Sequence, residues 1–184
     1  MINMKKVIIV HGYGGDPNKN WFPWLKQELE KKEVQVIIPQ MPNAESPQLS
    51  EWLPFLDSIV GNPDENTILI GHSLGCITIL RYLETLREDQ KIGKVILVSG
   101  FAEPIHYTEL NNFFETELDF VRIKKVTGEI ILINSDNDEH VPLWQGESMS
   151  KKLDAKLIIM NGAGHINEKS GFKELPIVLQ ECLN

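Results

Sequence analysis

Six short runs of consecutive apolar, largely β-branched residues constrain the fold of this chain more than any other feature. A half-exposed antiparallel strand would alternate apolar and polar residues, and none of these runs does so. Continuous apolar strands separated by helical segments are typical of a parallel sheet with helices on both faces. We therefore expect a three-layer α/β/α sandwich with a mostly parallel sheet of about six strands. The runs are KVIIV (6–10), VQVII (34–38), TILI (67–70), KVILVS (94–99), EIILIN (129–134) and KLIIM (156–160).

The segments between these runs carry helical periodicity. Trp21, Leu25 and Leu29, for example, recur at the spacing that places apolar side chains on one face of a helix. In the last such segment Pro176 is expected to limit the first turn. Four helices are predicted, over residues 21–29, 49–60, 74–86 and 171–183.

The stretch 101–128 is the least regular part of the chain, and it is the insertion large enough to cap a pocket. We expect one helix within it, around TELNNFFETEL (108–118). No repeat or linker divides the sequence, and 184 residues suit one domain. One domain over residues 1–184 is therefore expected.

Charge and hydropathy argue against several classes of protein. The chain has 18 Lys and Arg against 26 Asp and Glu, a formal net charge of −8. Phosphate backbones require clustered basic residues, so no nucleic-acid partner is expected. The longest apolar runs are strand-sized, so none should span a membrane. The start, MINMKK followed by VIIVHGYGG, lacks the length and cleavage site of a secretory signal, which favours a cytoplasmic location.

The two cysteines, Cys76 and Cys182, lie far apart and match no zinc-ligand spacing. Both are expected to be reduced and packed in the core. Because Cys76 follows Ser73 by one helical turn, reaction of its thiol with an electrophile is the alternative.

The motif Gly71-His72-Ser73-Leu74-Gly75 lies between a predicted strand and a predicted helix. This is the pattern of a nucleophile elbow, in which serine takes a strained conformation and small residues flank it because two backbones approach closely. The following helix directs its N-terminus toward the serine, where negative charge is stabilised. The alternative is a serine that only caps the helix.

A nucleophilic serine needs a base and a carboxylate that orients the base. Of the five histidines, His165 follows the last predicted strand, and so it should share the carboxyl edge of the sheet with Ser73. His11 is expected to bond loop backbone, and the His72 side chain to point away from the serine. After the fifth strand Asp136, Asp138 and Glu139 compete for the orienting role, and spacing alone does not choose among them. The remaining histidines are His106, in the irregular insertion, and His140.

A tetrahedral intermediate also needs two amide donors. The backbone N–H of Leu74 follows from the elbow, and HGYGG at 11–15 offers the N–H of Tyr13. This loop lacks the Lys-Ser/Thr of a phosphate loop and the third glycine of a dinucleotide fingerprint, so no cofactor is expected. No metal is expected either, although one rival hypothesis remains. It is a metal site at the sheet edge, formed by His11, Asp136, Asp138, His140 and His165.

Taken in order, these motifs resemble the α/β-hydrolase superfamily. The whole chain is similar to the YdeN and retinoblastoma-binding-protein-nine group of small serine hydrolases, through HGYGG, WFPWLKQELEK, MPNAESPQLSEWLPFL, GHSLG, DNDEHVP and GAGHIN. The resemblance implies that the acid is Asp138, since Asp138-Glu139-His140-Val141-Pro142 matches the group's Asp-x-x-Val-Pro pattern. It also implies a compact α/β-hydrolase fold with little or no lid. Tyr13 stands where the group is varied, and its ring would wall the acyl side of the pocket.

The function expected on this basis is a serine hydrolase, of carboxylesterase type (EC 3.1.1), that cleaves small carboxylic esters through an acyl-enzyme. A peptidase or amidase on the same triad, and a protein-binding module on a hydrolase scaffold, are the alternatives. A small-molecule ester or amide is the expected partner, and nothing in the sequence identifies a protein partner. An apolar substrate pocket is expected from Trp21, Phe22, Phe101, Trp144 and Ile166, with ordinary core packing as the alternative.

Overall fold

The computed structural model describes residues 5–184, and residues 1–4, which begin the segment assessed for a secretory signal, lie outside it. Six strands form one sheet in the order β2-β1-β3-β4-β5-β6, and every neighbouring pair is parallel. The predicted parallel six-stranded sheet is therefore confirmed. The strands are β1 (Lys6–Val10), β2 (Gln35–Ile37), β3 (Thr67–His72), β4 (Ile92–Val98), β5 (Thr127–Ser135) and β6 (Lys156–Met160).

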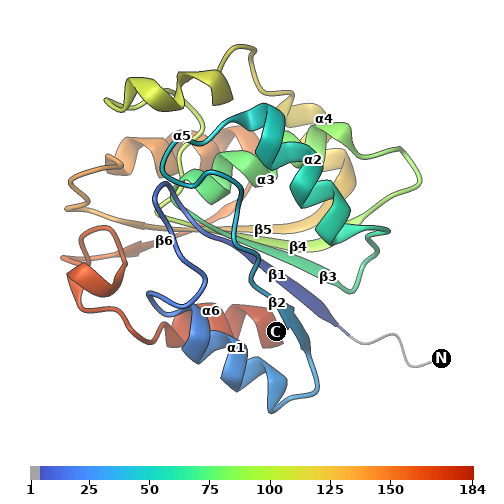
Figure 1. Ribbon diagram of the computed structural model, residues 1–184, viewed down its shortest axis with the longest axis horizontal. Helices are drawn as coiled ribbons and strands as arrows, with labels where there is room; N and C mark the ends of the chain where they lie inside the picture. The colour runs from blue at the N-terminus through green and yellow to red at the C-terminus, as the bar shows by residue number, and fades with distance from the viewer. Residues whose placement is uncertain (1–4) are drawn as a thin grey trace.

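Helices cover both faces of this sheet, which gives the three layers visible in Figure 1. The two faces follow from the pleat of the strands, because successive side chains of β1 enter opposite cores. Val7 packs with α1 (Phe22–Glu30) and α6 (Pro176–Leu183), whereas Ile8 packs with the other helices. Those helices are α2 (Leu49–Val60), α3 (Leu74–Thr85), α4 (Phe120–Val126) and α5 (Leu143–Leu153).

The helix expected over residues 108–118 is wrong. That segment holds only the 3₁₀ helix η1 (Thr108–Phe113), and α4 begins after Asp119, whose side chain accepts the Arg122 N–H at 2.8 Å. The reason is a long-range contact. The buried Arg81 guanidinium, on α3, donates hydrogen bonds to the backbone carbonyls of Phe113, Thr116 and Glu117. These carbonyls therefore accept from a side chain and not from the backbone N–H groups of an α-helix.

The last predicted helix also begins later than expected, since α6 begins at Pro176, and the 3₁₀ helix η2 (Glu168–Ser170) precedes it. A proline at the first helical position needs no N–H partner, which explains this start. Across residues 5–184 no helix reaches the length and hydropathy that crossing a bilayer requires.

The loops that follow the strands gather at the carboxyl edge of the sheet, as a parallel arrangement requires. The loops that leave this edge are residues 11–21 after β1, 38–48 after β2, Ser73 after β3, the stretch beginning at Ser99 after β4, residues 136–142 after β5 and residues 161–167 after β6. Ser73, Asp138 and His165 are therefore brought to the same edge of the sheet.

Candidate active site

The elbow at Ser73 has the strained geometry that its glycines predicted. Ser73 has φ 54° and ψ −119°, a conformation that side-chain-bearing residues rarely adopt. A Cβ added to Gly71 would lie 2.8 Å from the backbone nitrogen of Cys76, and one added to Gly75 would collide with the carbonyl oxygen of Val10. Only glycine fits at either position, because β3, α3 and β1 approach so closely.

His165 and Asp138 are joined by a hydrogen bond between the loops after β6 and β5. The distance from His165 Nδ1 to Asp138 Oδ2 is 2.8 Å, and the side chains are 10% and 1% exposed. The other oxygen, Oδ1, accepts the backbone N–H groups of His140 and Val141 at 2.9 and 3.0 Å. Burial raises the pKa of Asp138, but the hydrogen bond and charge of His165 and the two amides outweigh burial and leave it below its ordinary value. Asp138 is therefore held as a carboxylate.

The two competing carboxylates are placed elsewhere. Asp136 Oδ1 accepts the backbone N–H of Gly162 at 2.7 Å and so fixes the turn after β6. The Glu139 side chain is 82% exposed and faces His140, at 3.4 Å. Of the three acidic residues in this loop, Asp138 is the one that bonds His165.

Ser73 and His165 line the same cavity, whose volume is about 420 Å³. The glycine loop forms another part of its wall: a Cβ on Gly12 would lie 3.0 Å from Ser73 Cβ. Tyr13 also lines the cavity, and its side chain is partly exposed. Leu74, the first residue of α3, lies directly beside the serine, and its backbone N–H belongs to the helical turn that lacks intrahelical acceptors.

The backbone of the His165 loop is held by side chains from three distant elements. The carbonyl oxygen of His165 accepts His72 Nε2–H at 3.0 Å and Ser99 Oγ–H at 3.1 Å. Trp21 Nε1–H donates to the carbonyl of Ile166 at 3.0 Å. Burial is the main cause that lowers the pKa of His72 to about 3, so its ring is neutral and acts as a donor. Sequence reasoning missed these contacts, because each joins residues far apart in the chain.

A second group that sequence reasoning missed lies beside His165. The Tyr107 hydroxyl and His140 Nδ1 are 2.7 Å apart, and the His140 ring meets that of His165 edge-on, with centroids 4.9 Å apart. The Tyr107 ring in turn lies 6.3 Å from that of Tyr13. The irregular insertion therefore contributes one aromatic side chain to the surroundings of the site.

Comparison with known proteins identifies the family of this chain. A family model described as serine hydrolase matches residues 7–183. The chain belongs to the serine hydrolase family.

Two relatives of this serine hydrolase match over nearly its whole length. YdeN of Bacillus subtilis (strain 168) is 39% identical over 175 residues, which cover 95% of this chain and 92% of YdeN. Serine hydrolase RBBP9 of Rattus norvegicus is 30% identical over 188 residues, with 100% and 98% covered. The crystal structure of the Bacillus subtilis ydeN gene product superposes with a TM-score of 0.95 at 38% identity, covering 98% of this chain and 97% of that one. The expected compact α/β-hydrolase fold is confirmed.

The five residues expected to form an apolar pocket do not line the cavity that Ser73 and His165 share. Four of the five have no exposed surface and belong to the two cores: Trp21, Phe22, Phe101 and Ile166. Trp144 is 47% exposed on α5, and it is not among the described residues that line the cavity. Aromatic residues at loop ends are packed inward here, since they anchor the loops, and the cavity is lined mainly by glycine, amide and charged residues.

The remaining histidines of the serine hydrolase are placed as follows. Buried His11 donates Nδ1–H to the carbonyl of Gly12 at 2.8 Å and accepts the Met41 N–H at Nε2, at 2.9 Å, as expected of a residue that bonds loop backbone. His106 lies against Tyr107, with ring centroids 4.0 Å apart. Because His11 and Asp136 are committed to backbone groups, the rival metal hypothesis lacks a common donor set. Within residues 5–184, no group of three or more His, Cys, Asp or Glu is arranged to hold a metal ion.

Both cysteines of the serine hydrolase are buried and free. The Cys76 thiol points to the carbonyl of Val98 at 3.4 Å, and burial raises its pKa above the ordinary value. Burial likewise raises the pKa of Cys182 to about 12. These are packed thiols, so the alternative of a reactive Cys76 finds no support in its surroundings.

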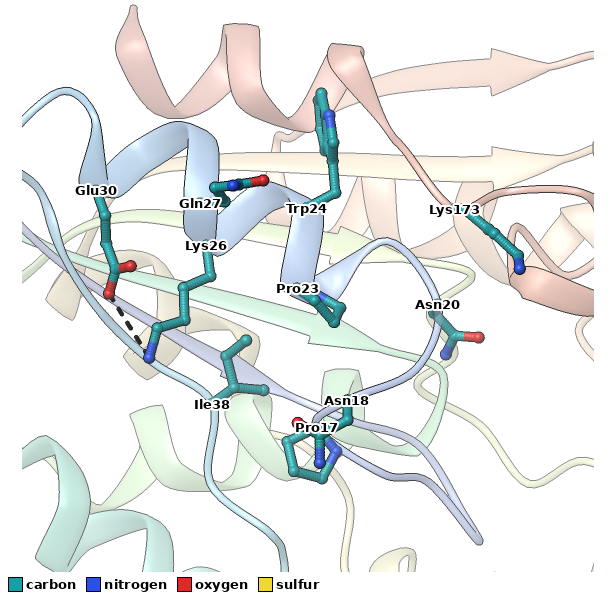
Figure 2. Close-up of a pocket in the computed structure, with 10 residues that line it drawn as sticks. All are labelled: Pro17, Asn18, Asn20, Pro23, Trp24, Lys26, Gln27, Glu30, Ile38 and Lys173. Atoms are coloured by element: carbon teal, nitrogen blue, oxygen red, sulfur yellow. Dashed lines mark ion pairs between the residues drawn. The ribbon is translucent and has the colours of Figure 1, made fainter.

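A larger hollow of about 760 Å³ adjoins the cavity of the serine hydrolase at Asn20, which lines both. Figure 2 shows this hollow between α1, with Pro23 and Trp24, and the loop that carries Asn18 and Asn20. Asn20 has a positive φ of 57°, and its Oδ1 accepts the backbone N–H of Glu168 at 3.0 Å. It therefore ties the loop after β1 to η2.

Proposed function

We propose that this serine hydrolase cleaves small carboxylic esters, as a carboxylesterase of class EC 3.1.1, through Ser73, His165 and Asp138. The observation that carries the proposal is the 2.8 Å hydrogen bond from His165 Nδ1 to Asp138, made by a histidine that lines the same cavity as Ser73. A buried carboxylate on one ring nitrogen leaves the other free to act as a base.

In the proposed mechanism, Ser73 Oγ attacks the ester carbonyl while His165 Nε2 takes its proton. Asp138 fixes the tautomer and stabilises the imidazolium that forms. The lowered pKa of Asp138 supports this role, since a carboxylate that remains ionised can stabilise that charge. His165 then protonates the departing alcohol, and water attacks the acyl-enzyme by the same route in reverse.

The proposed oxyanion donors are the backbone N–H groups of Leu74 and Tyr13. Leu74 lies at the positive end of the α3 dipole, which favours negative charge beside Ser73. Gly12 supports the second donor, because its lack of a side chain lets the loop that carries Tyr13 approach Ser73. The Tyr13 side chain also lines the cavity.

Cavity size and lining support a small substrate. A volume of about 420 Å³ lies in the lower part of the range for small-molecule sites. Tyr13 is the one large aromatic among the described residues that line it, so a long alkyl chain would gain little from burial there.

The test is intact-mass analysis after incubation with a fluorophosphonate, followed by assays of p-nitrophenyl esters. Wild type should gain one adduct and Ser73→Ala none, and turnover by Ser73→Ala should fall by about 10⁴-fold or more. Asp138→Asn should be severely impaired, whereas the control Asp136→Asn should keep most of its activity, because Asp136 bonds only the turn at Gly162. Near-normal turnover by Ser73→Ala, or the reverse ranking of the two asparagine variants, would contradict the proposal.

A further inference from the structure

Two lysines stand on the wall of the cavity that Ser73 and His165 share. Lys19 comes from the loop after β1 and Lys169 from η2, and both side chains are exposed. Among residues 5–184, no carboxylate lies within ion-pair distance of either ammonium group. Their positive charges therefore border the cavity without a close protein partner.

The carboxylates of the same wall already have donors. Asp16 Oδ1 accepts the backbone N–H and the side-chain amide of Asn18 at 2.7 and 3.1 Å. Glu168 forms an ion pair with Lys173 at 2.9 Å, and this lysine, with a smaller effect from Lys19, holds the pKa of Glu168 below its ordinary value. Figure 2 shows Lys173 beside the neighbouring hollow, near Asn20.

The wall of this cavity carries more positive charge than the chain as a whole. Lys19 and Lys169 balance Asp16 and Glu168 there, in a protein whose net charge is −8, and Glu168 is paired with Lys173 from the neighbouring hollow. At physiological ionic strength, charges more than about 8 Å apart are largely screened from one another. A bound group therefore interacts mainly with the lysines close to it. Among residues 5–184 neither Lys19 nor Lys169 forms an ion pair, so an anionic group reaching the cavity would meet two unpaired ammonium groups.

We propose that Lys19 and Lys169 bind a carboxylate carried by the ester substrate, so that the natural substrates are anionic esters. This inference rests on the proposed function, because it places the carboxylate in the cavity of the reacting Ser73. Lysine suits the role, since its flexible stem lets a point charge follow ligands of different length. The inference replaces the apolar substrate pocket expected from sequence with a cavity that carries two unpaired lysines.

The experiment compares esters that differ only in a terminal carboxylate. On the acyl side the pair is mono-p-nitrophenyl adipate and p-nitrophenyl hexanoate, and on the alcohol side 3-acetoxybenzoate and phenyl acetate, each corrected for its uncatalysed hydrolysis. Each pair gives a ratio of kcat/KM, anionic over neutral, for wild type and for Lys19→Gln/Lys169→Gln. The double variant Lys31→Gln/Lys151→Gln is the control, because it removes the same charge at exposed positions outside the cavity.

We expect the ratio in one pair to fall about tenfold in Lys19→Gln/Lys169→Gln, as for two exposed charge pairs, and to be unchanged in the control. Raising the ionic strength to about 0.5 M should reduce the wild-type ratio. The pair that responds identifies the half of the substrate that carries the carboxylate. If wild type forms the fluorophosphonate adduct but neither ratio changes in the double variant, the carboxylate site is wrong and the proposed function stands. Without an adduct, both fail together.

Discussion

At the carbonyl oxygen of His165, the contribution of a second hydrogen-bond donor to stability can be measured. This oxygen is buried and accepts two hydrogen bonds, from His72 at 3.0 Å and from Ser99 at 3.1 Å. Ser99→Ala removes one donor. His72→Phe removes the other and keeps a ring between those of Trp21 and Phe22, whose centroids lie 6.2 and 6.0 Å away.

The expected magnitudes follow from what each variant leaves behind. Either single substitution leaves the carbonyl one donor, so each should lower the free energy of unfolding by about 1 kcal/mol, the net value of one hydrogen bond. The double substitution leaves a buried carbonyl without a partner, which costs about a further 1–3 kcal/mol. The two changes should therefore be coupled by at least about 1 kcal/mol.

Urea unfolding of wild type, both single variants and the double variant completes the cycle. Ser58→Ala is a matched control for the serine, because its hydroxyl bonds only the carbonyl of Phe55 at an exposed position. The cycle of His72→Phe with Ser58→Ala should be additive. Additivity within about 0.5 kcal/mol for the His72 and Ser99 pair as well would show that the two donors do not share one acceptor, and the reasoning would be refuted.

Two further predictions concern pH and the insertion. The folded pKa of His72, about 3, lies below its ordinary value of 6.5, so the unfolded state binds the extra proton between these values. His72 therefore lowers the free energy of unfolding only below about pH 6.5, by about 1.4 kcal/mol for each pH unit toward pH 3. When the free energy of unfolding is measured against pH in this range, its slope should be smaller in His72→Phe than in wild type by the equivalent of about one proton. Arg81→Met should release the carbonyls of Phe113, Thr116 and Glu117 and lower stability by about 2–3 kcal/mol. Hydrogen exchange should then quicken around residues 108–119 more than in the strands, and uniform exchange would contradict the anchoring role.

The parts of the fold that could be predicted from the sequence are those with local causes. Each strand has its own continuous apolar run, and the glycines around Ser73 report a close backbone approach within the same few residues. The placement of His165 at the carboxyl edge of the sheet, beside Ser73, needed only the direction of a parallel strand. The preference for Asp138 over Asp136 came from the family resemblance. The structure adds a separate observation, the hydrogen bond between Asp138 and His165.

What could not be predicted depends on contacts between distant segments. The bond from His72 to the His165 carbonyl joins positions 93 residues apart, and Tyr107 reaches His140 across 33 residues. The predicted helix over residues 108–118 was wrong because Arg81, on another element, takes the carbonyls of that stretch. The apolar pocket was wrong because an aromatic residue near a loop end has the same local sequence signature whether it lines a cavity or anchors a loop.

The residues of the candidate site come from distant parts of the chain, so the order of synthesis determines when the site is complete. Ser73 precedes β4, whereas His165 follows β6, which is synthesised after the other five strands of the sheet. A nascent chain that has folded β1 through β4 holds the strained serine without its proposed base. Under the proposed function, hydrolysis begins only when β5 and β6 have joined the sheet, so incomplete chains and those truncated before β6 are catalytically silent.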